Sequence, residues 1–409
     1  MSKDTVLVIT SYPSKDTKHD KGVSGLASFA KNTVESIPKD NINIIVLAEK
    51  KDKFDVYKEG DVLVKRIWQR NTLRLYFQLF KQAWIYRKVS NKILLEFEYS
   101  VYGSNFVTGF MPIFIIAARV LGYKTVSVMH QVIRSREILS QNLGLAQRSF
   151  KLHIVYFLTQ IFTRFFTFVS SHIVVLDEVH KQNLKDITNI KKVTVIPHGV
   201  EQRDVVQKET GKKINLLYFG FLAWYKGADW LIDSYLEFSK HNPELADKFH
   251  ITMAGGESPT QSVNPKYREY YDGMVRKANE NKNITITGFV KEEDFDTIFG
   301  NADIQILPYR AIMSSSGPLS WAFTYEKPVL LSNILSPYLE TEDIKEVLNE
   351  LKISSNQFTF NLDKPFKLFE RLLEMPKPDL NRLSEFSREV KGKRNWKWLG
   401  EKYLSIILS

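Results

Sequence analysis

The sequence predicts an α/β protein built from two doubly wound domains. Three observations carry this prediction. Strand-like runs of β-branched residues alternate with helix-like segments from Val6 onward, which is typical of a parallel sheet covered by helices on both faces. The same alternation starts again at Ile214, after the polar, lysine-rich linker 201–213. A length of 409 residues suits two domains of ordinary size.

The expected elements of the first half follow one another at short intervals. Short β-branched and apolar runs mark the strands, and apolar residues three and four positions apart mark the helices. The expected strands are Val6–Thr10, Ile42–Leu47, Asp61–Trp68, Ile93–Phe97, Thr125–His130, Ser171–Leu176 and Val193–Pro197. The expected helices are Leu26–Ile37, Leu73–Val89 and Pro112–Leu121.

The second half repeats this order. The expected strands are Ile214–Phe219, His250–Ala254, Ile284–Thr287, Ile304–Leu307 and Pro328–Leu331. The expected helices are Ala228–Lys240, Pro265–Asn279, Glu292–Phe299 and Gly317–Tyr325. Ligands of doubly wound sheets bind at the carboxyl ends of the strands, so two such domains predict a site in the cleft between them.

Composition excludes several kinds of chemistry. The chain has no cysteine, which excludes disulfides, thiolate nucleophiles, cysteine-bound zinc and cysteine-ligated iron–sulfur clusters. Its eight histidines form no HExxH motif. Asp294 and Asp296 form a DxD pattern, but they lie at an acidic helix start, where acids are favoured without a metal. We therefore expect no metal and no cofactor. The apolar run Val6–Ile9 is too short for a signal-peptide core.

The positive charge is concentrated in the first half. Residues 1–200 hold 29 Lys and Arg against 16 Asp and Glu, whereas residues 201–409 hold 28 against 30. This asymmetry indicates that the first half faces an anionic partner, such as nucleic acid, phospholipid headgroups or a phosphorylated substrate. The alternative is a basic surface without a specific partner.

One segment, Leu152–Val169, is apolar enough to need a membrane test. It is 18 residues long and contains His153, Gln160 and Arg164. A spanning helix needs about 20 apolar residues and tolerates a central arginine badly. We therefore expect a buried helix, with an interfacial helix on a bilayer as the alternative.

In each half of the sequence, one glycine-bearing loop follows the first strand. Gly22 and Gly25 precede a helix, where backbone can approach an anion closely, although a plain turn has the same composition. The loop from Gly220 to Gly227 carries Lys226 just before the next helix. A lysine there can meet a phosphate, and the alternative is an exposed turn lysine.

A third segment follows the strand Ile304–Leu307. Arg310 is followed by a serine-rich helix start, Ser314-Ser315-Ser316-Gly317-Pro318-Leu319. Hydroxyls and free N–H groups at a helix start suit a diphosphate or sugar hydroxyls, although simple capping needs only one serine. His130 ends a strand on the expected ligand side, and the alternative there is a satisfied core histidine.

Eight segments in this order resemble the GT-B glycosyltransferases of glycosyltransferase family 4. The first two are the Gly22-to-Gly25 loop and the strand ending in His130; the linker Ile196-Pro197-His198-Gly199-Val200 resembles the family's IPNGV. The others are Gly220 to Gly227 (GRLxxxKG), Met253 to Gly256 and Ile286 to Val290 (GxG and GxV), Ala302 to Pro308 (ADV…LP) and Glu326 to Val329 (GKPV). Trp396–Leu408 resembles the family's last helix.

The resemblance implies two Rossmann-like domains facing across a cleft. Residues 1–198 would bind the acceptor, 199–385 the nucleotide-sugar, and 386–409 would form a C-terminal helix that crosses back to the first domain. It implies a retaining, metal-independent hexose transfer from a GDP- or UDP-linked donor. Lys226 would neutralise the departing diphosphate and His130 would contact the donor sugar. The implied donor-binding residues are Gly22, Gly25, Gly220, Lys226, Gly255, Val290, Arg310, Ser314, Ser315, Ser316, Gly317 and Leu319.

Three positions depart from the family pattern. Phe221 stands where the family has arginine, and Met313 and Trp321 stand where it has two glutamates that meet the donor sugar and the ribose. The chain resembles a subgroup with a Ser-Ser-Ser-Gly segment, in which Arg310 and the serines are candidate substitutes.

These observations predict a cytoplasmic transferase that acts on a lipid-linked or glycan acceptor in polysaccharide biosynthesis. The basic first half favours peripheral contact with the inner face of the membrane. The alternative, motivated by the three departures, is a non-catalytic GT-B partner subunit of another glycosyltransferase. We expect no nucleic-acid partner, because charge alone favours one and no nucleic-acid motif is present.

Overall fold

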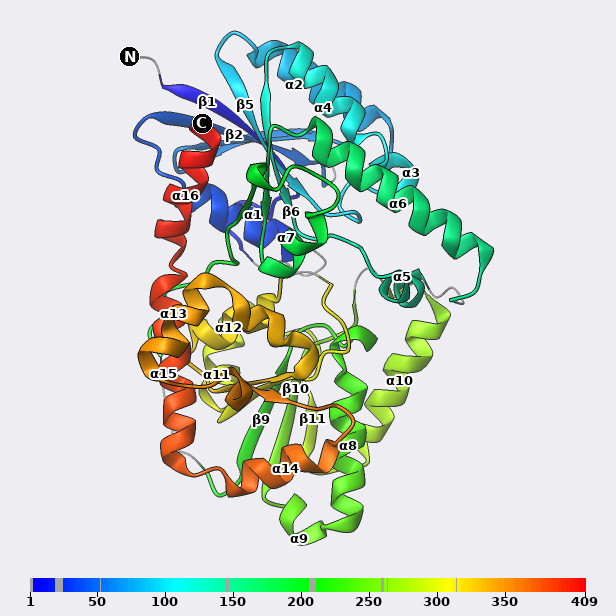
Figure 1. Cartoon of the computed structure of the whole chain (residues 1–409), viewed down its shortest axis with the longest axis vertical. Helices are drawn as coiled ribbons and strands as arrows, with labels where there is room; N and C mark the ends of the chain where they lie inside the picture. The colour runs from blue at the N-terminus through cyan, green and yellow to red at the C-terminus, as the bar shows by residue number, and fades with distance from the viewer. Residues whose placement is uncertain are drawn as a thin grey trace. The chain divides into compact units, whose positions relative to one another are not determined.

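The chain folds into two units. The computed structural model describes residues 3–18, 25–51, 53–143, 147–205, 211–258, 261–262, 264–313 and 315–409 (Figure 1). The first unit comprises Met1–Gly199, Met313–Ser315 and Trp396–Ser409, and the second comprises Val200–Ile312 and Ser316–Asn395. Each unit contains one sheet with helices on both faces, so the predicted α/β class with two doubly wound sheets is confirmed.

The first unit has eight strands. They are β1 (Asp4–Ile9), β2 (Ile42–Glu49), β3 (Asp55–Glu59), β4 (Val62–Trp68), β5 (Ser90–Phe97), β6 (Lys124–Met129), β7 (His172–Val175) and β8 (Val193–Val195). Its helices are α1 (Gly25–Ser36), α2 (Arg74–Tyr86), α3 (Asn105–Thr108), α4 (Met111–Val120), α5 (Arg136–Leu143), α6 (Phe150–Val169), α7 (Glu178–Leu184), the 3₁₀ turn η1 (Ile190–Lys192) and α16 (Trp396–Leu408).

The second unit has six strands. They are β9 (Ile214–Phe219), β10 (Phe249–Ala254), β11 (Ile284–Ile286), β12 (Ile304–Leu307), β13 (Val329–Ser332) and β14 (Thr359–Phe360). Its α-helices are α8 (Ala228–His241), α9 (Pro243–Ala246), α10 (Pro265–Asn279), α11 (Phe295–Gly300), α12 (Gly317–Thr324), α13 (Glu342–Leu351), α14 (Pro365–Glu374) and α15 (Lys377–Lys393). Its 3₁₀ helices are η2 (Trp224–Lys226), η3 (Glu292–Asp294), η4 (Asn333–Glu340) and η5 (Ser355–Phe358).

Strand order gives each sheet a switch point. The first sheet runs β3-β4-β2-β1-β5-β6-β7-β8 and the second β11-β10-β9-β12-β13-β14. The chain therefore reverses its direction of winding between β1 and β5, and again between β9 and β12. Ligands of doubly wound sheets bind beyond the carboxyl ends of the strands at such points.

Two strands were absent from the sequence-based prediction, β3 and the two-residue β14. β3 pairs antiparallel with β4, whereas the other paired strands of both sheets are parallel. Its sequence is short and charged, which weakens the strand signal, and the turn into β4 uses Gly60 at φ +55°. As a charged edge strand it also blunts the open edge of the sheet.

Alternate residues of the strands build two cores in the first unit. In β1, Leu7 and Ile9 join the core beneath α2, α4 and α6, whereas Val6 and Val8 join the core beneath α1 and α16. A strand's side chains alternate between faces, so one apolar run supplies both cores. The second unit repeats this logic, because Leu216 and Leu217 of β9 point into different clusters.

Helix α6 corrects the expectation of a buried helix. Only Leu152, Thr163, Phe166, Thr167 and Val169 are buried among its twenty residues. By length and composition it is the one helix, within the described ranges, that could cross a membrane. Only 28% of its most apolar 18-residue window is buried inside the structure. The sequence pattern failed here because α6 packs along one side only and leaves its other apolar residues exposed.

The C-terminal segment returns to the first unit. The sequence places this return at residues 386–409; α15 stays with the second unit, and the return comprises Trp396–Ser409. Trp396, Leu399 and Tyr403 of α16 then pack into the core beneath α1.

Candidate functional site

The loop after β9 is held at the switch point of the second sheet by close backbone contacts. The Gly220 N–H donates to the Ala254 carbonyl at 2.9 Å. A Cβ on Gly255 would lie 1.9 Å from the Gly220 oxygen, and a Cβ on Gly227 would lie 1.9 Å from the Pro308 oxygen. Gly227 also has φ +68°. Gly255 and Gly227 thus have structural reasons to be glycine, independent of any ligand.

Lys226 is the central charged group of this loop. Its side chain is buried, with 9% of the residue exposed, and burial lowers the pKa of Lys226 to about 8. Among the residues that the structure describes, none forms an ion pair or hydrogen bond with its ammonium group. The predicted alternative, an exposed turn lysine, is therefore wrong.

Aromatic rings surround the Lys226 ammonium. The centroids of the Phe221, Tyr225 and Tyr309 rings lie 6.0, 5.9 and 5.9 Å from Nζ. At that range cation–π attraction offsets only part of the lost hydration. The net result is a cation that has no anionic partner among the residues that the structure describes.

The start of α12 converges on the same point. A Cβ on Gly220 would lie 3.1 Å from both Lys226 Nζ and Pro318 Cγ. Lys226 therefore lies beside the first turn of α12, whose N-terminal end carries partial positive charge. Two positive features at one strand end favour an anionic group, as in other phosphate sites at helix starts.

The serine-rich segment is partly used for capping. Ser316 is the N-cap of α12: its Oγ accepts a hydrogen bond from the Leu319 N–H at 3.2 Å and lies 3.3 Å from the Tyr309 hydroxyl. Gly317 opens the helix and has open space around its Cα. Ser314 lies outside the described residues. Capping thus accounts for Ser316 and leaves Gly317 accessible.

Arg310 is a brace within the second unit. Its guanidinium donates to both carboxylate oxygens of Asp229 at 2.7 and 2.9 Å and to the Trp224 carbonyl at 2.9 Å. Burial alone would lower the pKa of Arg310, but the Asp229 carboxylate outweighs it and raises this pKa. The predicted donor-binding residue therefore ties the loop after β12 to the start of α8.

The neighbouring aromatic cluster explains two further positions. Val290 packs against a cluster that contains Phe295, Phe299 and Trp321. The Trp321 ring lies edge-on to Phe295 at 4.8 Å and beneath the Arg203 guanidinium at 5.0 Å. Trp321 therefore serves packing, and its indole offers no carboxylate to a ligand.

His130 lies at the carboxyl end of β6 in the first unit. Its Nε2 is 2.7 Å from Oε2 of Glu96, a fully buried residue of β5. The Phe29 ring packs edge-on at 4.6 Å. The other Glu96 oxygen, Oε1, is buried without a hydrogen-bond partner. The pair fixes the imidazole in one orientation and directs its Nε2 to the carboxylate.

One of the two predicted glycines of the first unit lies at the start of α1. Gly25 is the first residue of α1, and a Cβ there would meet no atom within 4 Å. Gly22 falls outside the described residues. Gly25 therefore leaves open space at this helix start.

Glu96 and Asp229 are functional candidates that sequence reasoning missed. Glu96 interrupts the apolar run Ile93–Phe97, and a carboxylate inside a buried strand was an available signal. Asp229 lies in the first turn of α8, where an acid is ordinary, so its pairing with Arg310 left no local signal.

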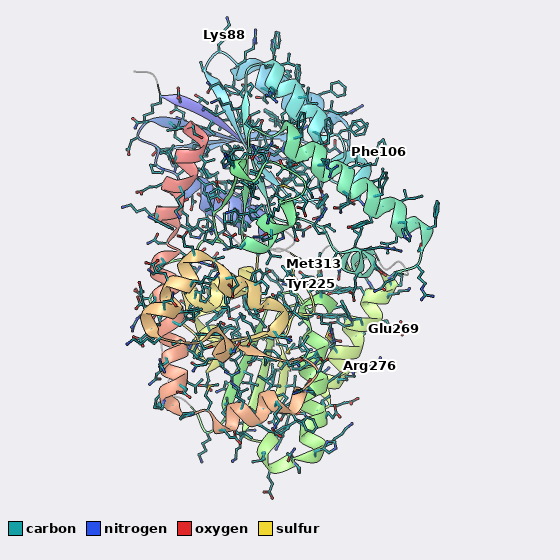
Figure 2. The ribbon with its side chains drawn as sticks, viewed as in Figure 1. Lys88, Phe106, Tyr225, Glu269, Arg276 and Met313 are labelled. Atoms are coloured by element: carbon teal, nitrogen blue, oxygen red, sulfur yellow. The ribbon has the colours of Figure 1, made fainter. Side chains whose placement is uncertain are left out.

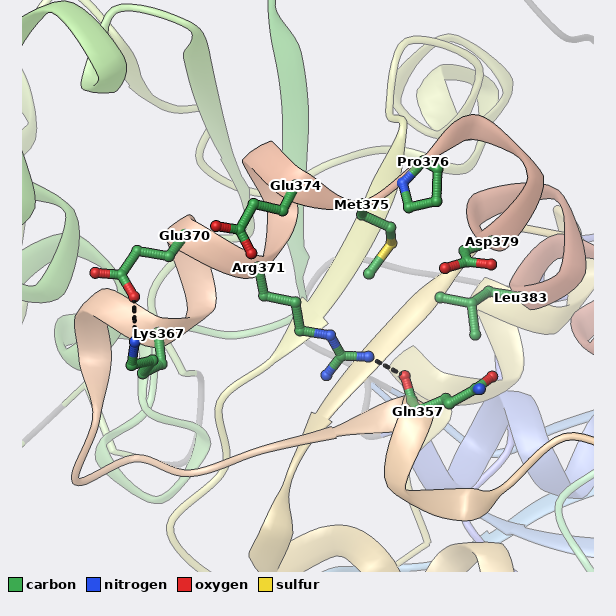
Figure 3. Close-up of a pocket in the computed structure, with 9 residues that line it drawn as sticks. All are labelled: Gln357, Lys367, Glu370, Arg371, Glu374, Met375, Pro376, Asp379 and Leu383. Atoms are coloured by element: carbon green, nitrogen blue, oxygen red, sulfur yellow. Dashed lines mark hydrogen bonds and ion pairs between the residues drawn. The ribbon is translucent and has the colours of Figure 1, made fainter.

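A hollow in the second unit has no relation to these residues. Its volume is about 400 Å³, and it lies between η5, α14 and the start of α15 (Figure 3). Both of its cationic side chains are already engaged: Lys367 pairs with Glu370 at 2.7 Å, and Arg371 donates to the Gln357 carbonyl. The hollow is therefore a poor candidate for an anion site.

Metal ligands do not gather in the part of the chain that the structure describes. Within those ranges, no three His, Asp or Glu side chains are placed to hold an ion. The hydroxyl of Tyr325 donates to Asp296 of the DxD pattern at 2.5 Å.

Comparison with known proteins defines the class of this domain. Residues 199–346 match the family model for glycosyl transferases group 1, and these residues contain Lys226, Arg310 and the start of α12. The chain thus carries a group 1 glycosyltransferase domain. No curated protein matches the chain in sequence.

Solved structures show that the whole chain has the GT-B fold of glycosyltransferases. A sucrose-phosphate synthase from Thermosynechococcus elongatus has a TM-score of 0.71 at 13% identity, covering 99% of this chain and 98% of that one. A trehalose-6-phosphate structure from E. coli bound with UDP-2-fluoro glucose has a TM-score of 0.65 at 10% sequence identity, and the match covers 99% of each chain. HepE from Anabaena, in complex with UDP and glucose, has a TM-score of 0.62 at 12% sequence identity, and the match covers 98% of each chain.

Proposed function

We propose that this chain is a retaining, metal-independent glycosyltransferase of the family 4 type. It moves a hexose from a UDP- or GDP-linked donor to a lipid-linked or glycan acceptor in polysaccharide biosynthesis. The observation that carries this proposal is Lys226, a buried ammonium at the switch point of the group 1 domain that has no counter-charge among the described residues.

The chemistry of sugar transfer supplies the missing anion. When the bond between the anomeric carbon and the phosphate oxygen breaks, negative charge grows on the diphosphate. A cation already fixed beside that group stabilises the charge without reorganising. Lys226 and the first turn of α12 meet this requirement, since both lie against Gly220.

Other groups of the second unit complete the proposed donor site. Backbone at Gly220, Gly255 and Gly317, with Ser314, Ser315, Ser316 and Leu319, borders the diphosphate, and Val290 borders the base. Arg310 acts through the loop that it braces, because its donors are already engaged by Asp229 and Trp224. His130, held by Glu96, is proposed to contact the donor sugar.

A UDP-linked donor is the first to test, because the Anabaena structure binds UDP and the E. coli structure binds UDP-2-fluoro glucose. A lipid-linked acceptor would place the protein at the cytoplasmic face of a membrane.

Thermal shift with UDP, GDP, ADP and their sugar conjugates tests the site. A ligand at 100 times its dissociation constant stabilises by about 2.7 kcal/mol, which moves the midpoint of a domain of this size by several degrees. We expect a shift for one base, and we expect Lys226→Ala to weaken it. Transfer of labelled sugar from that donor to lipid and glycan acceptors follows. No shift with any nucleotide would contradict the proposal.

A specific observation favours a second candidate, a non-catalytic partner subunit. Trp321 fills an aromatic cluster, and Phe221 stands beside Lys226, so neither supplies the polar group found there in the family. Nucleotide binding without transfer or hydrolysis by the isolated chain would favour this candidate.

A further inference from the structure

An exposed apolar face covers one side of the first unit. Helices α2, α4 and α6 lie side by side over the same core, with α4 packed against both others (Figure 1). Seventeen of the twenty-five large hydrophobic side chains exposed in the described residues belong to 73–89, 105–120 and 150–168. Phe77, Val120 and Phe168 are 77%, 82% and 72% exposed. A concentration of this size marks an interaction surface.

The three segments that carry this face are basic and contain no acidic residue. The segments 73–89, 105–120 and 147–169 contain eight Lys and Arg and no Asp or Glu. Seven of these cations are exposed: Arg74, Lys81, Lys88, Arg119, Arg148, Lys151 and Arg164. Lys88 at one end of the face and Phe106 of α3 are labelled in Figure 2.

Charge decides which partner fits this face. A second copy of the chain would bring the same cations together, and like charges at an interface are unfavourable. An anionic bilayer offers acyl chains to the aromatic and aliphatic residues and phosphates to the Lys and Arg around them. Trp84 and Arg87 suit the boundary between acyl chains and headgroups. The Arg87 guanidinium carbon lies 3.7 Å from the centroid of the Trp84 ring, and such a pair has an apolar body and a polar tip.

Polar bonds hold α6 on the first unit. Gln160 donates to the Ile133 carbonyl at 2.9 Å, and the Thr163 hydroxyl lies 3.0 Å from that of Tyr99. Phe166 is fully buried in the core. A spanning helix would have to break these contacts, so α6 lies along a surface and does not cross it.

We propose that the α2–α4–α6 face docks the first unit onto an anionic lipid bilayer, with its apolar side chains in the interface and its cations on the headgroups. This proposal does not depend on sugar transfer, because it rests on a different surface and is measured by binding.

Vesicle co-sedimentation tests the proposal. The full chain is mixed at low salt with vesicles of phosphatidylcholine, with or without about one-third phosphatidylglycerol. We expect binding to the anionic vesicles, little to the neutral ones, and a loss of about tenfold or more for Lys81→Glu with Lys88→Glu. The control, Lys58→Glu with Lys240→Glu, makes the same change in net charge at exposed lysines elsewhere and should bind as wild type does.

The apolar contribution is tested separately. Phe157→Glu removes a side chain that is 63% exposed on α6, and Phe54→Glu removes one that is 58% exposed away from this face. We expect the first to weaken binding at least about fivefold and the second to leave it unchanged. Both residues are exposed, and thermal midpoints check that both variants fold.

Three results would overturn the proposal. The first is no binding to anionic vesicles at low salt. The second is equal loss in the face variants and their controls. The third is a dimer in light scattering that Phe157→Glu dissociates, which would mean that a second copy covers the face.

Discussion

Each of the two sheets buries an ionisable group near the carboxyl ends of its strands, but the two groups differ in whether a partner of opposite chemistry lies beside them. In the first unit, His130 lies 2.7 Å from the buried Glu96. In the second, the Lys226 ammonium has three aromatic rings near it and no carboxylate within 4.0 Å among the described residues. A compensated group can fix an orientation without a ligand. An uncompensated one costs stability until an anion arrives.

His130→Ala gives the largest expected effect. It removes the only described partner of the Glu96 carboxylate and leaves that group buried, which costs about 3–5 kcal/mol. We expect the thermal midpoint of the first unit to fall by many degrees in calorimetry. Exchanging both partners, with His130→Leu and Glu96→Leu, should recover most of the loss. A small effect for His130→Ala would contradict this expectation.

Lys226→Met tests the difference between the buried groups of the two sheets. Removing one preorganised charge from a transition state lowers turnover by about 10² to 10³. Because the ammonium has no ion-pair or hydrogen-bond partner in the described part of the chain, the same change should raise the thermal midpoint of the nucleotide-free protein. Steady-state kinetics, with the donor identified by thermal shift, measure the turnover. Calorimetry of the nucleotide-free chain measures the thermal midpoint. A lower midpoint would show that Lys226 is structural.

The pH dependence tests the same lysine. Its folded-state pKa of about 8 lies below the value of 10.5 for an unfolded lysine. Between these values the unfolded chain binds more protons, so Lys226 makes the free energy of unfolding rise with pH. A bound diphosphate favours the ammonium, so affinity should fall about tenfold per pH unit above 8. Titration calorimetry across pH 7 to 10 measures this, with Lys226→Met as the control whose affinity stays flat.

Ser316→Ala gives the smallest expected effect. It removes the N-cap of α12, which costs about 1 kcal/mol. Affinity for the nucleotide should fall only severalfold, because the Lys226 charge remains. Ser320→Ala, in the interior of the same helix, is the matched control for stability. A loss of affinity as large as that of Lys226→Met would assign the Ser316 hydroxyl to the ligand instead of the cap.

The fold was predictable because its signals are local. The alternation of strand and helix patterns gave both sheets, and β3 was missed because its charged, five-residue sequence carries little strand signal. The prediction for α6 was wrong because composition shows that a helix is apolar but not how many of its sides are covered.

The candidate site was predictable only in part. The sequence predicted an anion-binding loop at Lys226 and another at the start of α12, and the structure places Lys226 and Pro318 of α12 against Gly220. Their roles did not follow from the sequence. Arg310 braces the loop through Asp229, and Gly255 admits the backbone of Gly220.

The sequence by itself determined the alternation of elements, the absence of thiol chemistry, the basic first half and the glycines where two backbones meet. The tertiary structure decided which charges are paired. Glu96 and His130 are 34 positions apart and Asp229 and Arg310 are 81 apart, and only folding brings such partners together. It also decided that Lys226 loses its hydration without gaining a polar partner among the described residues, and that α2, α4 and α6 leave one apolar face uncovered. Burial and pairing depend on what the rest of the chain places around a residue, and sequence spacing does not contain that information.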